Sequence, residues 1–363
     1  MRINFSKCMT LVIFLIAISL VASACNPTPV VITLAPTLTA SPSDTPAPTS
    51  PATAIATVAP VPSDTPTPEV PCFVTYYDPF AFLPDSLRLL VRADMGVQQF
   101  NLQIMKSEKF IQAPNIIDGP AVALFPDGIL AWAFESGEIQ EIYLSGSKQT
   151  YTIQSGQESP LKLEFSPTED RLYSSSHDGT VQFWDLQGHQ KDMYGNYGEL
   201  VNIGVSPDGS MMAIIPYDGP VTLVYADNFV LVKELGGSGG YDTSDVSFSP
   251  DGRYLAADLA TGLYIWRISD GKELLGANNP IYSMAVTYSP DGKYLAYSDI
   301  NNVVLSSPDG SQKIRTLEGH QMPIFELLFS PGGSTLVSAD DMDIRVWRVE
   351  DGELLAIGKR ECP

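Results

Sequence analysis

Two stretches, Phe248-Ser249-Pro250-Asp251-Gly252 and Tyr288-Ser289-Pro290-Asp291-Gly292, are nearly identical and lie about 40 residues apart. Weaker copies of this pattern place further prolines at positions 84, 126, 167, 207 and 331, so that proline recurs about every 41 residues. Internal repeats of this length are typical of propeller blades or of helical arrays. Pro-Asp and Asp-Gly favour tight turns, because Pro presets one backbone dihedral angle and Gly accepts a positive one.

The sequence between the prolines favours strands over helices. Short apolar runs flank each turn, such as Leu161-Leu163-Phe165 before it and Tyr254-Leu255-Ala256-Ala257 after it. Two further runs follow in each repeat, and turn residues recur every 8–12 positions, which is typical of short antiparallel strands. Four strands in each of seven repeats predict an all-β fold, a seven-bladed β-propeller of four-stranded antiparallel blades.

Several segments resemble the WD-repeat (tryptophan–aspartate repeat) β-propeller family. The stretch Asp178-Gly179-Thr180-Val181-Gln182-Phe183-Trp184-Asp185 has the family's third-strand signature, Ile344 to Trp347 repeats it, and Gly319-His320 matches its Gly-His pair. The resemblance covers residues 78–359. It implies a structural hydrogen-bond network in the last blade, made by His320, Ser338, Asp341 and Trp347. Gly156-Gln157 replaces Gly-His in the third blade, and several blades lack the Trp.

Composition excludes several classes of function. The 363 residues carry 21 Lys and Arg against 42 Asp and Glu, a formal net charge of −21. We expect no nucleic-acid binding, because that needs clustered basic residues. Only three His and four Cys are present, so we expect no metal site and no cofactor. No catalytic residues are recognisable, because the scattered His residues adjoin no nucleophile elbow and no phosphate-binding loop occurs.

The N-terminus has the three parts of an export signal. Arg2 and Lys7 precede an apolar run from Leu11 to Val21, and small residues then lead to Cys25. Residues 1–24 resemble a bacterial lipoprotein signal peptide, which implies that Cys25 is lipidated. Ala22 stands where that signal prefers Leu, so cleavage by ordinary signal peptidase and free secretion stay open as an alternative. The expected location is the outer side of a bacterial membrane, facing the cell exterior or the periplasm, with the lipid as the only membrane contact.

The composition of the segment after Cys25 indicates a tether. Residues 26–71 hold 12 Pro and 10 Thr, with no Lys, Arg or aromatic residue. Such a composition cannot bury enough apolar surface to fold, and its prolines favour an extended, semi-stiff spacer. We therefore expect residues 25–71 to be a lipidated Cys and a disordered linker, and residues 72–363 to be the propeller.

Two cysteines flank the expected propeller. Cys72 and Cys362 stand at its two ends, where the first and last blades must be joined to close the ring. In an exported domain they can form a disulfide bond that closes this seam. Two free thiols in a reducing environment are the alternative.

An acidic residue recurs in the turn between the second and third strand of each blade. In a propeller these turns share one face. A negatively charged surface that attracts a basic partner is one interpretation, simple capping of tight turns is another, and calcium coordination is a third. The residues of this acidic face are Asp94, Glu135, Asp178, Asp218, Asp258, Asp299 and Asp340.

The loops on the same face are the partner-binding region of the resembled family. Tyr and Met are favoured at the centres of interfaces because they bury much area and adapt to different partners. Packing of these side chains on their own blade is the alternative. The candidate partner-binding residues are Tyr194, Tyr197, Tyr241, Asp242, Gln321 and Met322.

These observations favour a membrane-tethered, non-catalytic module that binds a protein or an envelope polymer, and a basic partner would suit its acidic face. A monomer is expected, because a closed ring leaves only short protected edges. An enzyme that acts on an envelope glycan through paired carboxylates is the second hypothesis. A solute-sensing lipoprotein is the weakest, because solute-binding proteins are usually hinged and two-lobed.

Overall fold

The computed structural model describes residues 32–34 and residues 81–359, the second range with short gaps. The gaps are 84, 86–87, 94–95, 103–105, 113–120, 126–127, 135, 145–150, 159, 186–188, 196–198, 238, 240–244 and 277–280. Among the described residues there is no helix with the length and apolar character needed to cross a membrane.

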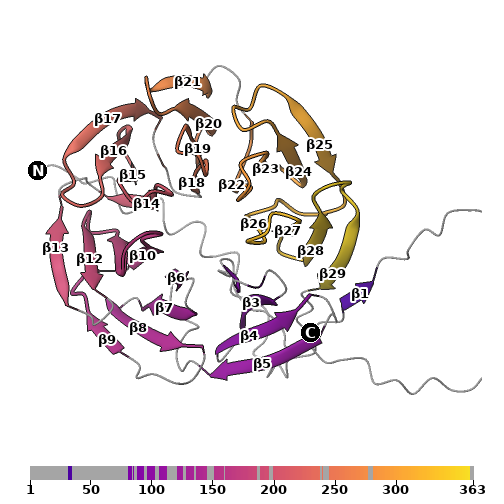
Figure 1. Ribbon diagram of the computed structural model, residues 1–363, viewed down its shortest axis with the longest axis horizontal. Helices are drawn as coiled ribbons and strands as arrows, with labels where there is room; N and C mark the ends of the chain where they lie inside the picture. Colours follow the sequence, from indigo (N-terminus) through magenta and orange to yellow (C-terminus); the bar gives the residue numbers. More distant parts are fainter. Residues whose placement is uncertain are drawn as a thin grey trace, which may run out of the picture.

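Seven antiparallel sheets follow one another around a ring, which confirms the prediction of a seven-bladed propeller (Figure 1). The strands of each blade run in sequence order from the central axis to the rim. Blades one to three comprise β2 (Ala81–Phe82), β3 (Arg88–Ala93), β4 (Gly96–Asn101), β5 (Lys106–Gln112); β6 (Ala121–Phe125), β7 (Ile129–Ala133), β8 (Glu138–Tyr143), β9 (Tyr151–Gln154); β10 (Pro160–Phe165), β11 (Arg171–Ser176), β12 (Val181–Asp185) and β13 (Gln190–Tyr194).

The later blades have the same order. Blades four and five comprise β14 (Leu200–Val205), β15 (Met211–Pro216), β16 (Val221–Tyr225), β17 (Leu231–Gly236); β18 (Val246–Phe248), β19 (Tyr254–Leu259), β20 (Gly262–Arg267) and β21 (Lys272–Leu275). Blades six and seven comprise β22 (Val286–Tyr288), β23 (Leu295–Asp299), β24 (Asn302–Ser306), β25 (Lys313–Leu317); β26 (Glu326–Phe329), β27 (Thr335–Ala339), β28 (Asp343–Arg348) and β29 (Leu354–Lys359).

The Ser-Pro-Asp-Gly sequence forms the turn between the first and second strands. In blade five the Ser249 hydroxyl donates to Asp251 at 2.7 Å and accepts from the Tyr254 N–H at 2.9 Å. Gly252 supplies the positive φ, 67°, that the turn requires. Blade six repeats these bonds with Ser289 and Asp291. A further copy at 307–310, outside the 41-residue period, makes the turn between β24 and β25.

Each blade buries both of its faces against its neighbours. Seven separate apolar clusters fill the seven interfaces between adjacent blades. On β3, for example, Leu89 and Val91 pack against blade seven, while Leu90 packs against blade two. This explains why second and third strands such as β19 and β20 are buried at nearly every position, where a strand with one solvent-facing side would alternate.

Apolar packing closes the ring between its first and last blades. Phe82 and Phe100 of blade one share a buried cluster with Val337 and Val346 of blade seven. The four strands of blade one are consecutive in the chain, and so are β26 to β29 of blade seven. The predicted Cys72–Cys362 disulfide lies outside the described residues and stays a prediction.

The segment predicted to lack secondary structure contributes one strand. Residues Ile32–Leu34 form β1, which pairs antiparallel with the outer edge of β29 and makes blade seven a five-stranded sheet (Figure 1). A strand edge offers free backbone donors and acceptors, so an extended segment can add to it without side-chain specificity. Cys25 and the predicted signal peptide lie outside the described residues.

One carboxyl group is buried inside the apolar cluster between blades two and three. Glu141 on β8 is 0% exposed, two positions from Ile139 and therefore on the same face of the strand. Among the described residues its carboxylate oxygens have no hydrogen-bond partner. Burial, together with the negative charge of Asp185, raises the pKa of Glu141 to about 7.

The raised pKa predicts that Glu141 destabilises the propeller as the pH rises. The unfolded chain ionises near its ordinary value of 4.5, whereas the folded chain holds the proton to about 7, so the loss of stability accumulates between these pH values and totals about 3 kcal/mol. Glu141→Gln should therefore be more stable than wild type at pH 8 and close to it at pH 4.5. Urea unfolding at both pH values measures the difference.

The exposed Glu350 provides the control for this measurement. Glu350→Gln should change the free energy of unfolding little and by the same amount at both pH values. An equal effect of Glu141→Gln at pH 4.5 and pH 8 would contradict the assignment of a raised pKa.

Candidate functional site

The candidate site is one face of the ring, which we call the loop face. It consists of the turns between the second and third strands and of the connections between blades. Because every blade is an antiparallel sheet in the same strand order, these two kinds of loop lie at the same end of the strands. The turns after the first and third strands lie on the opposite face.

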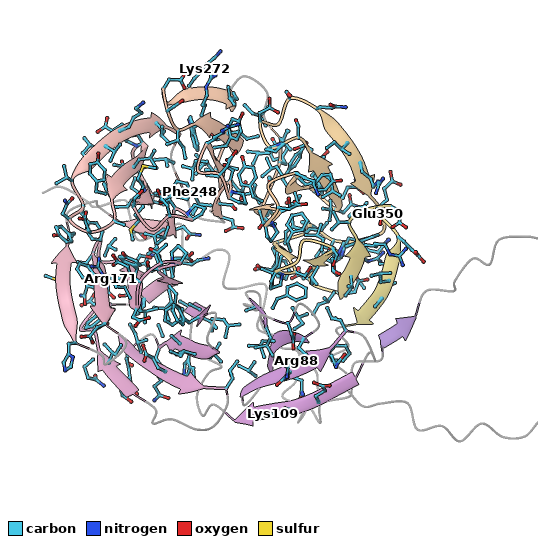
Figure 2. All side chains as sticks on the ribbon, viewed as in Figure 1. Arg88, Lys109, Arg171, Phe248, Lys272 and Glu350 are labelled. Atoms are coloured by element: carbon cyan, nitrogen blue, oxygen red, sulfur yellow. The ribbon has the colours of Figure 1, made fainter. Side chains whose placement is uncertain are left out.

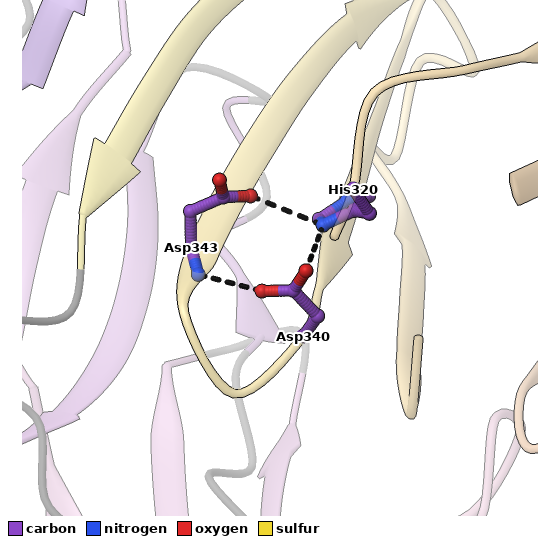
Figure 3. A group of neighbouring side chains, drawn as sticks. All are labelled: His320, Asp340 and Asp343. Atoms are coloured by element: carbon purple, nitrogen blue, oxygen red, sulfur yellow. Dashed lines mark hydrogen bonds and ion pairs between the residues drawn. The ribbon is translucent and has the colours of Figure 1, made fainter. Parts of the chain in front are cut away.

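In blade seven a buried polar network anchors the loop face (Figure 3). The Nδ1 atom of His320 lies 3.0 Å from carboxylate oxygens of both Asp340 and Asp343. Its Nε2 atom lies 2.6 Å from the Ser338 hydroxyl oxygen, which also accepts from the Trp347 indole N–H at 2.7 Å. The network thus ties the connection between blades six and seven to β27 and β28.

The carboxylate in this network belongs to Asp340, whereas the sequence predicted Asp341. Asp340 lies just after β27, where its carboxylate accepts the backbone N–H groups of Met342 and Asp343 at 2.8 and 2.7 Å. These bonds point the Asp340 side chain inward, and Asp341 at the tip of the turn is exposed. The sequence did not indicate Asp343, which also binds Arg345 at 2.8 and 3.1 Å.

The charges of the network stabilise one another. Burial opposes the charged form of His320, but the bonds to Asp340 and Asp343 outweigh burial and raise its pKa above the ordinary value. Burial likewise acts against the charged forms of Asp340 and Asp343, and the bonds to His320 outweigh it and lower both pKa values. The two carboxylates thus favour the imidazolium form of His320.

The network resembles a metal site and a catalytic triad in composition, but its surroundings favour neither. The ligand atoms of His320, Asp340 and Asp343 lie within 4.8 Å of one another. A cation there would have to displace the His320 proton and compete with Arg345. Ser338, His320 and Asp340 have the order of a hydrolytic triad, but all three are buried and the Ser338 oxygen is shared with Trp347, so a substrate cannot reach it.

Blade three builds the equivalent network with a glutamine. The Ser174 hydroxyl donates to the Gln157 carbonyl oxygen at 2.6 Å and accepts the Trp184 indole N–H at 3.1 Å. The Gln157 amide donates to the Thr180 hydroxyl at 3.0 Å. Gly156-Gln157, which departs from the Gly-His pattern of the family, therefore still ties the connection between blades two and three to the second and third strands of blade three. In blade five Ala257 takes the position of the Ser, and the buried Trp266 indole N–H has no partner among the described residues.

The residues of the predicted acidic face lie in different environments. Asp178 and Asp218 are exposed at turns, and Asp178 accepts the Thr180 N–H at 2.9 Å, as the turn-capping interpretation requires. Asp258 and Asp340 are fully buried, and Asp299 is partly buried. Asp94 and Glu135 lie outside the described residues. Exposed negative charge on this face therefore comes from fewer of these acids than the sequence indicated.

The predicted partner-binding residues also lie in different environments. Gln321 and Met322 are exposed on the connection between blades six and seven. Tyr194 ends β13 at the rim, where its ring stacks on Phe229 of blade four with centroids 4.1 Å apart, as the alternative of packing within the propeller requires. Tyr197, Tyr241 and Asp242 lie outside the described residues.

Three exposed apolar residues on the loop face were not predicted from the sequence. Tyr282, Ile300 and Met342 are 78%, 54% and 52% exposed. A recognisable signal was available for two of them, because Ile300 and Met342 occupy turns in which other blades have Asp-Gly or similar polar pairs.

The innermost strands surround the central axis of the ring (Figure 2), and a separate group of charged residues lies on or next to them. Burial disfavours a charged Lys162 on β10, but the carboxylates of Asp245, Glu164 and Glu326 outweigh it and raise its pKa. Burial raises the pKa values of Glu164 and Asp245, against the opposing effect of Lys162. These acids come from β10 and from the residue before β18.

The fold and the repeated His/Gln–Ser–Trp networks define a β-propeller built from tryptophan-containing repeats. Residues 147–185 and 311–348 match the family model for the WD domain, G-beta repeat. Each matched segment ends at the strand that carries the Trp of a complete network, Trp184 or Trp347. Two of the seven blades thus match the WD40 repeat, and the chain as a whole forms a seven-bladed β-propeller similar to proteins of that family.

Curated relatives of the chain include WD repeat-containing proteins. The chain is 28% identical over 193 residues to a WD repeat-containing protein of Schistosoma mansoni, which covers 51% of this chain and 63% of that one. It is 27% identical over 147 residues to a WD repeat-containing protein of Synechocystis, covering 39% and 42%. It is 24% identical over 276 residues to nuclear distribution protein nudF of Aspergillus niger, covering 56% and 62%. The chain thus spans only part of each relative.

The network predicts a specific pH dependence of stability. Because the pKa of His320 is raised in the fold, its protonation contributes fully to the free energy of unfolding below about pH 6.5. This contribution is lost as the pH rises through the folded-state pKa. His320→Gln introduces the residue type that occupies the equivalent position in blade three, Gln157. It should keep the hydrogen bonds but remove the loss of stability with rising pH. The stability advantage of wild type over His320→Gln should therefore be larger at pH 6 than at pH 9, as measured by urea unfolding.

Two further variants control this experiment. His320→Ala leaves Ser338 and Asp340 without their buried partner and should cost about 3–5 kcal/mol. His177, an exposed histidine on the same face, can be changed to Gln with little effect on stability at either pH. An equal advantage of wild type over His320→Gln at pH 6 and pH 9 would show that His320 is neutral in the fold.

Proposed function

We propose that this protein is a non-catalytic scaffold that binds a protein partner through its loop face, while a lipid on Cys25 holds it on the outer side of a membrane. The observation that carries the binding function is the contrast within the loop face of blades six and seven. Polar groups that could do chemistry there are buried and bonded to one another, whereas Tyr282, Ile300 and Met342 are exposed. Exposed apolar groups on a rigid support suit recognition.

Three features support the membrane tether. The apolar run from Leu11 to Val21 has the length of a signal peptide, and small residues lead from it to Cys25. The Pro- and Thr-rich residues 26–71 begin directly after Cys25. Because β1 lies in this segment and pairs with β29, residues 26–31 are the spacer between Cys25 and the ring.

A glycan-acting enzyme is the second candidate, and the inner strands provide its one supporting observation. Burial raises the pKa values of Glu164 and Asp245, and a raised carboxyl pKa is what a general acid needs. The positive charge of Lys162 lowers both pKa values and weighs against this role. The scaffold function therefore has the better support.

The binding function predicts that exposed acids on the loop face contribute to capture of a partner. The full chain, immobilised, should retain a stoichiometric protein from detergent-solubilised envelope of the native organism. The combined change Asp218→Asn, Glu318→Gln and Asp341→Asn removes three exposed negative charges from this face and should reduce capture about tenfold at low salt. Quantitative mass spectrometry of the eluted proteins measures the change.

A matched variant on the opposite face controls for net charge. Asp170, Asp227 and Glu350 are exposed in turns after first or third strands, and their neutralisation should leave capture unchanged. Equal loss from both triple variants would point to non-specific charge effects. Release of sugars from the envelope fraction that stops on Glu164→Gln, with no protein captured, would favour the enzyme.

The tether predicts a simple change of location. Cys25→Ser removes the acceptor for the lipid, so the protein should move from the membrane fraction to the medium or the periplasm. Fractionation followed by immunoblotting measures this, and Cys8→Ser, within the signal segment, should leave the protein in the membrane fraction. Retention of the Cys25→Ser protein in washed membranes would contradict lipidation at this residue.

A further inference from the structure

Four large apolar side chains are exposed on the loop face of blades six and seven. Tyr282 is on the connection between blades five and six, and Ile300 is in the turn between β23 and β24. Met322 is on the connection between blades six and seven, and Met342 is in the turn between β27 and β28. Exposed fractions of 39% for Met322 and at least 52% for the others make this group accessible to a partner.

Hydrogen bonds hold these loops side by side. The Ile300 N–H donates to the Tyr282 carbonyl at 3.1 Å, and the Ile300 carbonyl accepts the Ile324 N–H at 2.8 Å. The Asp340 carboxylate accepts the N–H groups of Met322 and Met342 at 3.2 and 2.8 Å. The four residues therefore lie on neighbouring loops, and the group is here called the apolar row (Tyr282, Ile300, Met322 and Met342).

Ile300 has a backbone conformation that its side chain disfavours. Its φ is +58°, a left-handed value that β-branched residues rarely adopt. In the corresponding turns of blades two to five, the residues with positive φ are Gly137, Gly179, Gly219 and Gly262. A glycine would adopt the Ile300 backbone without strain, and most of the isoleucine side chain lies in solvent. Neither the backbone conformation nor the packing of the isolated propeller therefore favours isoleucine over glycine at this position.

The apolar row lies among acidic residues. The loops at 276–285, 299–302, 317–326 and 339–343 contain no Lys or Arg. Arg345, beneath them on β28, is buried and bound to Asp343. Basic side chains on a partner would therefore meet charges of the opposite sign here. The acidic residues of these loops are Asp299, Glu318, Glu326, Asp340, Asp341 and Asp343, of which Glu318 and Asp341 are exposed.

We infer that the apolar row is the specificity site of the loop face and binds a protein segment in which a large apolar side chain is flanked by Lys or Arg. This inference rests on the proposed binding function and names the residues and the partner chemistry. Methionine side chains are flexible and polarisable, so Met322 and Met342 can adapt around an aromatic or branched side chain. Glu318 and Asp341 then lie within reach of the flanking basic residues. Strain at Ile300 is retained because its side chain contributes to this contact.

A selection from a phage-displayed library of random dodecapeptides on the immobilised full chain tests this inference. Enriched peptides should combine a large apolar residue with neighbouring Lys or Arg. Their affinity should fall about tenfold on Ile300→Gly and on Met342→Ser, because each change removes a central apolar contact. Val230→Ser, which removes a side chain with a similar exposed fraction of 56% at the rim, should leave the affinity unchanged.

A thermal melt of the same variants tests the strain. Ile300→Gly should raise Tm by about 2 °C although it weakens binding, because glycine relieves the left-handed strain. A lower Tm would show that the Ile300 side chain stabilises the fold and would overturn the argument. Met342→Ser leaves the backbone unstrained and should change Tm little, so it reports on binding alone.

Several results would overturn the inference while leaving the proposed function in place. Peptides that lack basic residues, or that bind Ile300→Gly and Met342→Ser as tightly as wild type, would place recognition elsewhere on the loop face. Failure to enrich any peptide would exclude a linear segment as the partner. Binding of phosphatidylcholine vesicles that is lost on Met342→Ser would identify a lipid surface instead. Envelope capture that depends on Asp218, Glu318 and Asp341 but not on Ile300 would retain only the broader binding function.

Discussion

The apolar packing between adjacent blades is the interaction on which the other features of the propeller rest. Each four-stranded sheet has two apolar faces and cannot bury either one alone, so a single blade has no stable isolated form. Seven interfaces bury all fourteen faces, and the seam between blades one and seven is filled by the same kind of cluster as the others. Closure of the ring then fixes the ends of the strands from which the loops of each face extend. The described loops of the loop face are joined to strands that are packed on both sides.

The buried polar networks connect this packed core to the loop face. In blade seven a hydrogen bond joins His320, on an inter-blade connection, to Ser338, which also binds Trp347. In blade three Gln157 is joined in the same way to Ser174, which also binds Trp184. A histidine between two carboxylates and a glutamine thus perform the same structural task. Their difference lies in how stability responds to pH. The same bonds to Asp340 that hold the turn of blade seven also fix the backbone of Met322 and Met342.

The separation of buried polar chemistry from exposed apolar surface favours recognition over catalysis. Ser338, His320 and Asp340 are arranged like reactive groups but are buried in their own blade. The exposed residues of these loops include Tyr282, Ile300, Met322 and Met342. The cost of exposing the apolar row, and of the left-handed Ile300, is tolerable because the inter-blade clusters below supply the stability of the domain. Natural sequences depart from local rules mainly where function requires it.

The number of blades, the strand pattern and the turns follow from the amino-acid sequence alone, because each depends on local chemistry that repeats: Pro250 and Gly252 in a tight turn, and Trp184 or Trp347 on a third strand. The meeting of His320, Ser338 and Trp347 was also predictable, since the family pattern carries that arrangement. Whether Asp340 or Asp341 joins the network could be decided only from the folded chain. The side chain of Asp340 turns inward because it accepts the backbone N–H groups of Met342 and Asp343, and the adjacent Asp341 is exposed. The apolar row is likewise a tertiary feature, because its four residues come from loops separated by about 20 residues each and meet only when two blades pack side by side.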